Sequence, residues 1–219
     1  MKPKISKEIT QLIKKHSDHG IKLDIGCGRD KMEGHVGIDM LDLPGVDIVW
    51  NLEQFPWPLP DGCVSMASSS HLVEHINPMA LSPQLSNLFD LLLKKKVLTK
   101  KEIEEHIGET RFGPTFIRFM DEVWRVLKVG GTFHFVTPYA GSQGWWWDPT
   151  HINPIHDVTP EYFDPRGQRS WHPELKASFW RFYKPKPWKI EPGTPIWMPD
   201  GNLELVLRKR AFREDENYD

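Results

Sequence analysis

Residues Ile21-Lys22-Leu23-Asp24-Ile25-Gly26-Cys27-Gly28 form the stretch that decides the fold. Its first five residues predict a short strand that breaks into a glycine turn, and a second strand-like run, Val36-Gly37-Ile38-Asp39-Met40, follows. A turn at the carboxyl edge of a parallel sheet needs glycines so that its backbone can approach a ligand closely. The acidic residue that closes the next strand, Asp39, is placed to accept both hydroxyls of a ribose. The stretch therefore predicts a parallel sheet that binds a nucleoside.

Strands and helices alternate along the rest of the chain. Further strands are expected at 46–49, 63–68, 132–136 and, antiparallel, at 203–208, with helices from about Ile5 to Gly20 and over 116–127. The glycine pair Gly130-Gly131 is expected to end the second helix. The three alternate prolines within 55–62 predict an extended loop that ends in a turn. This order predicts an α/β domain whose mostly parallel sheet carries helices on both faces.

Composition narrows the class of protein. The chain has 219 residues, 26% of them charged, with a net charge of -2 and no apolar run long enough for a membrane span. A dedicated basic face is missing, which argues against nucleic-acid binding, and the start of the chain lacks the apolar region of a signal peptide. Cys27 and Cys63 are too few for a disulfide framework. We therefore expect a cytoplasmic protein with reduced thiols and neither a membrane nor a nucleic acid as partner.

The chain is expected to form one domain with several parts. Most of the prolines and tryptophans lie between Pro138 and Pro199, which favours irregular, aromatic-lined loops over a second regular domain. The expected parts are an N-terminal helix (1–20), a ligand-binding core (21–138) with a helical insertion at about 84–111, a substrate-side cap (139–202), and the last strand and tail (203–212).

Five motifs occur in a fixed order along the chain: Leu23 to Gly28, Gly37-Ile38-Asp39, Pro58 to Asp61, His71 to Ile76, and Arg125 to Gly131. Together they resemble the class I S-adenosylmethionine-dependent methyltransferases, in particular the type-11-like branch, over about residues 21–76 and 116–138. The resemblance implies a Rossmann-like, mostly parallel seven-stranded sheet. It also implies that S-adenosylmethionine lies over the carboxyl ends of the first strands.

The resemblance also assigns the residues of the cofactor site. They are Asp24, Gly26, Cys27 and Gly28 at the turn and the methionine end, Asp39 at the ribose, Met40, Asn51 and Leu52 around the adenine, and Ser68 and Ser69 under the sulfonium. Two features depart from the family pattern. Asp30 stands where many members carry a third glycine, and the short span from Asp24 to Asp39 predicts a turn around 29–34 instead of a first helix. NAD is the main rival ligand, but Lys31 holds the last position of its G-x-G-x-x-G pattern.

Three histidines are candidate catalytic residues. His151 and His156 follow the fifth strand and are expected to act as general base on the acceptor, because an imidazole titrates near neutral pH. The alternative is that His151 only braces its loop. His71 is the third candidate, whereas Glu74 and His75 are expected to have structural roles. The site is predicted without a metal, although Asp148, His151 and His156 could supply two imidazoles and a carboxylate.

Three consecutive tryptophans, Trp145 to Trp147, are the most unusual feature of the chain. Neighbouring side chains point to different faces, so at least one indole is expected to be exposed or to face a ligand. The alternatives are a hydrophobic plug or a dimer contact, and an aromatic wall around the acceptor. In the second case Tyr139 and Asp148 complete the acceptor site, and Trp171 and Trp180 extend the wall.

The sequence thus predicts methyl transfer from S-adenosylmethionine to an oxygen or nitrogen of a small-molecule or sugar-type acceptor, giving S-adenosylhomocysteine. Two other classes stay open. One is a non-catalytic adenosyl-binding scaffold or regulatory subunit, and the other is a metal-dependent enzyme built on the cap histidines. A homodimer is compatible with the tryptophans and with the predicted insertion.

Overall fold

The computed structural model describes residues 4–5, 7–15, 18–77, 92, 94–97, 99, 115–164 and 185–211. The expected insertion at 84–111 lies largely outside these residues, and Trp171 and Trp180 lie wholly outside them. The elements are β1 (Lys4–Ile5), α1 (Lys7–Lys15), β2 (Ile21–Ile25), β3 (Val36–Asp39), β4 (Ile48–Val49), β5 (Val64–Ser70), η1 (Val73–His75), α4 (Thr115–Val126), β6 (Leu127–Pro138), α5 (Gln143–Trp147), η2 (Thr159–Tyr162), β7 (Trp188–Ile190), β8 (Ile196–Trp197) and β9 (Asn202–Lys209). Among the described helices, none combines the length and the apolar character needed to cross a membrane.

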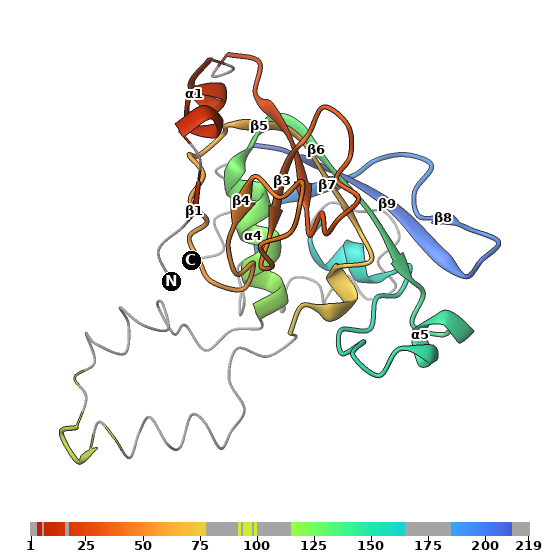
Figure 1. The fold of residues 1–219 in the computed structure, drawn as a ribbon. Helices are drawn as coiled ribbons and strands as arrows, with labels where there is room; N and C mark the ends of the chain where they lie inside the picture. The colour runs from red at the N-terminus through yellow and green to blue at the C-terminus, as the bar shows by residue number, and fades with distance from the viewer. Residues whose placement is uncertain are drawn as a thin grey trace.

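The strands form one sheet in the order β1-β4-β3-β2-β5-β6-β9-β7, with β8 paired to β9. The central strands β4, β3, β2, β5 and β6 are parallel to one another, whereas β9 runs antiparallel to both β6 and β7 (Figure 1). This confirms the predicted Rossmann-like, mostly parallel sheet and its antiparallel last strand. Within the described residues the sheet has nine strands where seven were predicted, because the two-residue strands β1 and β8 each add a pairing.

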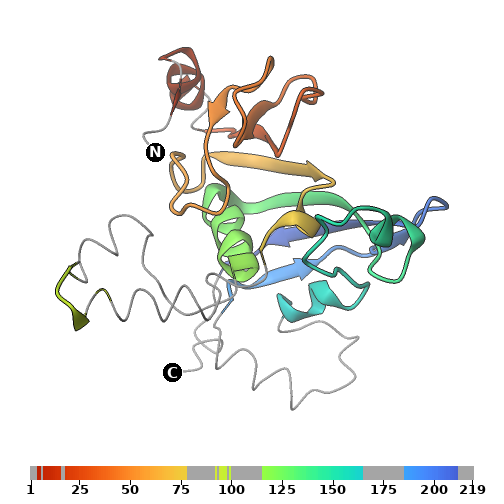
Figure 2. The ribbon, with the colours of Figure 1, turned by 60° about the horizontal axis from the view of Figure 1, so that its bottom comes forward.

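The chain reverses its direction of travel across the sheet at β2, which therefore marks the expected ligand crevice. β2 lies between β3, the next strand in the chain, and β5. Its last residue, Ile25, pairs with Ile38 on one side and with Ser69 on the other. In open α/β sheets ligands bind outside the carboxyl ends of the strands at such a point. Figure 2 shows α5, with the loops around it, on the side toward which β5 and β6 point.

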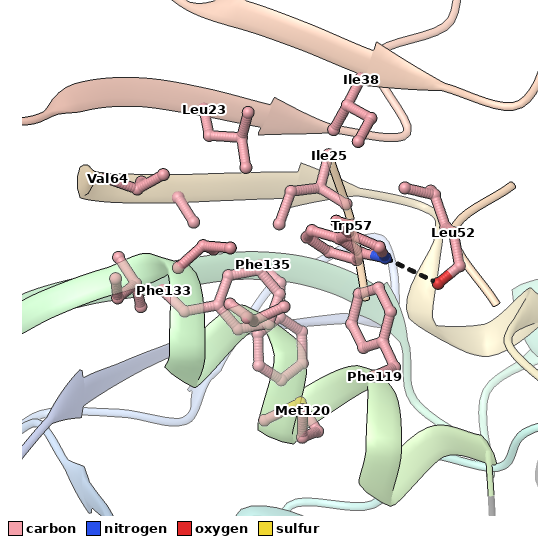
Figure 3. Close-up of a cluster of buried hydrophobic side chains, with 14 of the residues drawn as sticks. Leu23, Ile25, Ile38, Leu52, Trp57, Val64, Phe119, Met120, Phe133 and Phe135 are labelled. Atoms are coloured by element: carbon pink, nitrogen blue, oxygen red, sulfur yellow. Dashed lines mark hydrogen bonds between the residues drawn. The ribbon is translucent and has the colours of Figure 1, made fainter. Parts of the chain in front are cut away.

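Helix α4 and the loop before β5 bury one face of the central strands. Phe119 and Met120 of α4 face Phe133 and Phe135 of β6, and Trp57 lies beside them (Figure 3). Trp57 meets Phe119 edge-on with ring centroids 5.7 Å apart, and Phe119 meets Phe133 edge-on at 6.3 Å. Such aromatic pairs contribute about 0.5–1.5 kcal/mol each beyond the burial of their surface. The spacing of apolar residues over 116–127 correctly predicted this buried face.

β6 and β9 have one buried face and one partly exposed face. Leu203, Leu205 and Leu207 are fully buried, while the residues between them are partly exposed. On the partly exposed face, His134 Nε2 lies 2.8 Å from Glu204 Oε1. This alternation is typical of an antiparallel pair with one dry and one wet face.

The proline-rich loop over 55–62 is extended, as predicted, and is held by a buried polar network. The Trp57 backbone N–H donates to Glu122 Oε1 at 2.5 Å, and the Trp57 indole N–H donates to the Leu52 carbonyl at 3.0 Å. Arg125 donates to the carbonyls of Leu59 and Trp57 and pairs with Glu122 at 2.6 Å. Prolines remove backbone donors from this loop, so side chains of α4 satisfy its remaining backbone groups.

Two predicted boundaries are wrong. Ile5 was expected in the first helix, but it pairs with Ile48 in the sheet, and α1 begins two residues later and ends at Lys15. Gly130-Gly131 was expected to separate helix from strand, but both glycines lie inside β6 at an irregularity in its pairing with β5. Gly130 has a φ of 83°, and a Cβ on Gly131 would lie 2.9 Å from the carbonyl of Ser65.

The expected irregular cap contains two strands that the sequence did not reveal. β7 and β8 both pair with β9, so this part of the chain completes the sheet. Trp188 of β7 is fully buried and packs 6.3 Å from Phe133. Strands of two and three residues flanked by prolines are too short to show an alternating pattern.

Both cysteines are free and buried. Burial is the main cause that raises the pKa of Cys27 to about 12 and that of Cys63 to about 11. Both side chains are therefore neutral packing residues, because the thiolate is the reactive form of cysteine.

Asp121 on α4 gives a test of how burial affects stability. Its Oδ1 accepts the Lys186 backbone N–H at 2.7 Å, and burial raises the pKa of the carboxyl to about 7. Between about pH 4 and pH 7 the folded chain thus holds a proton that the unfolded chain has lost. The free energy of unfolding therefore falls as the pH rises through this window, and the stabilising effect of the proton is complete only below it.

We expect Asp121→Asn to remove this dependence, because the amide oxygen still accepts the Lys186 N–H and carries no charge. Urea unfolding should show the variant more stable than wild type by about 1–3 kcal/mol at pH 8 and equal to it near pH 4. The exposed Asp42→Asn serves as control. Parallel stability curves for Asp121→Asn and wild type would contradict the assignment.

Candidate functional site

The glycine turn after β2 is tied to the end of β3 by Asp39. Gly26 and Gly28 have φ values of 70° and 54°, the left-handed region that favours glycine. Asp39 Oδ2 accepts the Gly28 N–H at 3.0 Å, and its Oδ1 accepts the Leu41 N–H at 2.9 Å. Each carboxylate oxygen has a second lone pair, so Asp39 retains acceptor capacity toward a ligand.

Asp24 holds the short segment that replaces the first helix. Its Oδ2 accepts the Met32 N–H at 2.8 Å, and the side chain is 4% exposed. Burial raises the pKa of the Asp24 carboxyl, and the hydrogen bond from Met32 opposes this rise. The chain forms turns and no helix between Ile25 and Val36, as the short span predicted.

The two glycines of the turn serve different needs. A Cβ on Gly26 would lie 2.9 Å from the Leu72 side chain, whereas one on Gly28 would have no atom within 4 Å. Gly26 is therefore required by packing inside the protein, and the open side of Gly28 is the face that a ligand can approach. The Cys27 Sγ lies 2.6 Å from where a Cβ of Gly37 would be, so this thiol packs against β3. Cys27, predicted at the cofactor, therefore has a buried side chain.

The residues expected around the adenine differ in exposure. Met40 is 60% exposed, directly after Asp39, while Leu52 is 5% exposed and belongs to the core. Asn51 is exposed, and its Oδ1 accepts the Glu53 N–H at 2.9 Å. Of the three predicted residues, Met40 and Asn51 thus have the side chains exposed to a planar ligand, and the Leu52 side chain is buried.

Ser68 and Ser69 end the buried part of β5. They pair with Asp24 and Ile25 of β2 and are 3% and 2% exposed. Their expected place under the sulfonium stays a prediction.

The segment after β5 and the loop after β6 meet in a cluster of His71, Glu74, His75 and His151, called here the His–Glu cluster. His71 has a φ of 52°, and its Nδ1 lies 3.4 Å from Glu74 Oε1. This contact is the main cause that raises the pKa of His71. His75 and His151 meet edge-on with ring centroids 4.9 Å apart.

Glu74 anchors the loop as well as the cluster. Its side chain is fully buried, and its Oε2 accepts the hydroxyl of Thr137 at 3.0 Å. Its backbone carbonyl accepts the N–H groups of Ile152 and Asn153, and Asn153 Nδ2 donates to the Val73 carbonyl at 2.8 Å. These bonds fix the loop that carries His151 against η1.

Asp148 and Thr150 lie at the exposed side of the His–Glu cluster, next to the imidazoles of His75 and His151. Asp148 Oδ1 accepts both the N–H and the hydroxyl of Thr150, and these bonds lower the pKa of the exposed carboxyl. His75 Nδ1 lies 3.3 Å from the Thr150 carbonyl and 3.1 Å from its hydroxyl oxygen. His151 Nδ1 lies 2.9 Å from the Trp145 carbonyl. The Asp148-Pro149-Thr150-His151 segment is thus one hydrogen-bonded unit.

His156 belongs to a different group. Its Nε2 lies 2.5 Å from the Tyr139 hydroxyl, and its Nδ1 contacts the carboxylate of Asp157. Trp197, 52% exposed, packs edge-on against Tyr139 with centroids 4.5 Å apart. The sequence did not single out Trp197, since one tryptophan in a proline-rich stretch has no distinctive pattern.

The three predicted catalytic histidines therefore do not form one site. His71 and His151 lie in the His–Glu cluster, and His156 lies with Tyr139. The alternative metal set of Asp148, His151 and His156 is wrong, because His156 turns toward Tyr139 and Asp157. Among the described residues, the set that could hold an ion is Glu74, His75 and His151.

The three consecutive tryptophans divide as predicted. Trp145 is 7% exposed and packs on His151 with centroids 5.2 Å apart, while Trp146 and Trp147 are 76% and 74% exposed. Ser142 caps α5 by accepting the Trp145 N–H. At least one exposed indole was expected, and two are found.

Comparison with known proteins gives likenesses of structure alone: no family model and no curated protein matches the sequence. A SAM-dependent methyltransferase from Archaeoglobus fulgidus is 15% identical over 92% of this chain and 91% of its own, with a TM-score of 0.42. One from Aquifex aeolicus is 11% identical over 91% and 88%, with a TM-score of 0.42. The aminoglycoside resistance methyltransferase NpmB1 is 11% identical over 94% of each chain, with a TM-score of 0.47. Because these TM-scores are below 0.5, the fold is assigned from the strand order and strand directions described above.

Proposed function

We propose that this protein transfers a methyl group from S-adenosylmethionine to an oxygen or nitrogen of a small-molecule or sugar-type acceptor. The observation that carries the proposal is the arrangement of Asp39, Gly28 and Met40 at the crevice of the sheet. Asp39 binds the turn through Gly28 and keeps free lone pairs, the open side of Gly28 admits a ligand, and Met40 is exposed beside them. A ribose on Asp39 and an adenine on Met40 and Asn51 fit this arrangement.

The charges around the turn favour S-adenosylmethionine over a dinucleotide. Burial is the main cause that raises the pKa of Cys27, and the charges of Asp24, Asp39 and Asp47 raise it further. Lys31, which follows the turn, is held at 2.7 Å by Asp47. A pyrophosphate would be repelled by these carboxylates, whereas the ammonium and sulfonium of S-adenosylmethionine would be attracted.

The bound cofactor would supply an electrophilic methyl group on sulfur. The acceptor's lone pair forms the new bond to the methyl carbon as the carbon–sulfur bond breaks, and the acceptor proton passes to a base. The chain's own contribution is to hold both reactants in line and to exclude water, the role proposed for Trp146 and Trp147. His156 is proposed as the base, since Asp157 orients its imidazole and Tyr139 lies against its Nε2.

Label transfer tests this function. The full chain is incubated with methyl-labelled S-adenosylmethionine and a panel of phenols, sugars and amines, and labelled product and S-adenosylhomocysteine are measured. Equal amounts of both are expected with at least one acceptor class. Binding of S-adenosylhomocysteine without turnover on any acceptor would favour the scaffold alternative, and labelling of RNA alone would contradict the acceptor class.

We expect His156→Asn to lower kcat by about 10²-fold or more without changing the affinity for S-adenosylhomocysteine, because general-base catalysis contributes on this order. His134→Gln, on the wet face of the sheet, is the matched control and should keep full activity. An unchanged kcat in His156→Asn would remove the base assignment.

A further inference from the structure

The His–Glu cluster contains three potential metal ligands that the methyl-transfer proposal does not use. One ligand atom each from Glu74, His75 and His151 lies within 4.8 Å of the other two. Metal bonds of about 2.1 Å require ligand atoms roughly 3–3.5 Å apart, a separation that small side-chain rotations can reach. The three residues come from two segments, η1 and the loop after β6, which the backbone of Glu74 joins.

Both imidazoles are held in the tautomer that a metal ligand needs. The Trp145 carbonyl can only accept, so His151 Nδ1 must donate to it. The Thr150 hydroxyl donates its hydrogen bond to Asp148 Oδ1, so its oxygen can only accept from His75. His75 Nδ1 must therefore be a donor as well. In the neutral form of each ring, Nε2 therefore carries the lone pair. A ring N–H donated to a carbonyl or similar acceptor is the usual support of a metal-bound histidine.

Glu74 offers a buried carboxylate oxygen to this group. Its side chain is fully buried, and Oε1 accepts no hydrogen bond within the described part of the chain. His71 Nδ1 lies 3.4 Å from this oxygen and is its ion-pair partner without hydrogen-bond geometry. Burial of a carboxylate is costly unless its oxygens are satisfied, and an ion between the three residues would satisfy Oε1. Asp148 Oδ2 lies 3.8 Å from His151 Nε2, beyond hydrogen-bond length, and so leaves that nitrogen free.

We propose that Glu74, His75 and His151 bind one divalent transition-metal ion. Two imidazoles and one carboxylate suit Zn²⁺, Co²⁺, Mn²⁺ or Fe²⁺ and leave coordination positions open. This inference about the acceptor rests on the proposed function. The open coordination positions take the acceptor's oxygens, so the acceptor is a hydroxyl compound. The coordinated hydroxyl loses its proton to solvent or base at neutral pH, and the resulting oxyanion forms its bond to the methyl carbon as the carbon–sulfur bond breaks.

Cobalt titration tests the site without any assay of activity. The tag-free full chain is stripped with chelator, and Co²⁺ is followed by calorimetry and by visible absorption. One saturable site per chain is expected, with the absorption bands of nitrogen-ligated Co²⁺. His75→Ala and His151→Ala should each weaken Co²⁺ binding at least 100-fold. Glu74→Gln, which keeps the shape of the side chain and its Thr137 contact, should weaken it at least 10-fold.

His134→Gln is the matched control and should bind Co²⁺ as wild type does. Thermal unfolding of each variant separates loss of a ligand from loss of the fold. Absence of saturable binding to wild type, or undiminished binding in folded His151→Ala, would overturn the proposal. Calorimetry with S-adenosylhomocysteine on the same stripped protein keeps the two proposals apart, since that binding does not need the metal.

Discussion

Replacing Asp39 by alanine is expected to weaken the binding of S-adenosylhomocysteine at least 100-fold. Two contributions add in this prediction. The variant loses the acceptors for the ribose hydroxyls. It also loses the two hydrogen bonds that hold the turn, in which the Asp39 carboxylate accepts the N–H groups of Gly28 at 3.0 Å and Leu41 at 2.9 Å. Hydrogen bonds to a charged group contribute about 1.5–3 kcal/mol each, so two lost bonds to the ligand alone amount to about 100-fold or more. Calorimetric titration measures the effect directly.

Two further variants separate ligand contacts from support of the turn. Asp39→Asn keeps one acceptor oxygen and should lose affinity less than Asp39→Ala does. Asp42→Ala, three residues along and exposed, should bind as wild type does. Equal affinities of Asp39→Ala and Asp42→Ala for S-adenosylhomocysteine would show that the ligand does not bind Asp39 at the end of β3.

The largest loss of stability is expected for Glu122→Ala, at about 3–5 kcal/mol. Glu122 is 6% exposed and accepts from Arg125 and from the Trp57 backbone N–H. Without it the guanidinium loses its buried carboxylate partner and the Trp57 N–H loses its acceptor, in a loop whose prolines offer no replacement. Urea unfolding of the variant at neutral pH measures the change in the free energy of unfolding.

The same arginine offers the control. Arg125 Nη1 also pairs with Asp61 at 2.5 Å, but the Asp61 side chain is 82% exposed. Exposed ion pairs contribute about 0–1 kcal/mol, so Asp61→Ala should change the free energy of unfolding by less than about 1 kcal/mol. Losses of similar size in the two variants would contradict the view that burial sets the importance of the network.

Much of the parallel core was predictable because its signals are local. The runs ending at Ile25 and Asp39 are apolar, short and bounded by glycine or polar residues, and the buried face of α4 recurs with helical spacing. The short span after Asp24 also predicted the missing helix, since geometry alone limits what it can hold. β1, β7 and β8 were not predictable, because strands of two or three residues gain their order from their neighbours and leave no period in the sequence.

The histidine sites were harder to predict because their geometry depends on contacts between loops. Glu74 and His75 were expected to have structural roles, and Glu74 does anchor the loop at Ile152 and Asn153. What the sequence could not show is that this anchoring brings His151 beside His75. Asp148, His151 and His156 are close in sequence, but the loop turns His156 toward Tyr139 instead. Proximity along an irregular loop is therefore a poor guide to shared ligands.

The central claim is that the crevice at β2, bounded by Asp39, Gly28 and Met40, binds S-adenosylmethionine. Calorimetric titration of S-adenosylmethionine and S-adenosylhomocysteine into the wild-type full chain tests it most directly. We predict one site per chain with affinity in the micromolar range, about -8 kcal/mol, for both compounds, and no heat with NAD. Absence of binding of both compounds, or saturable binding of NAD at the same site, would contradict the claim.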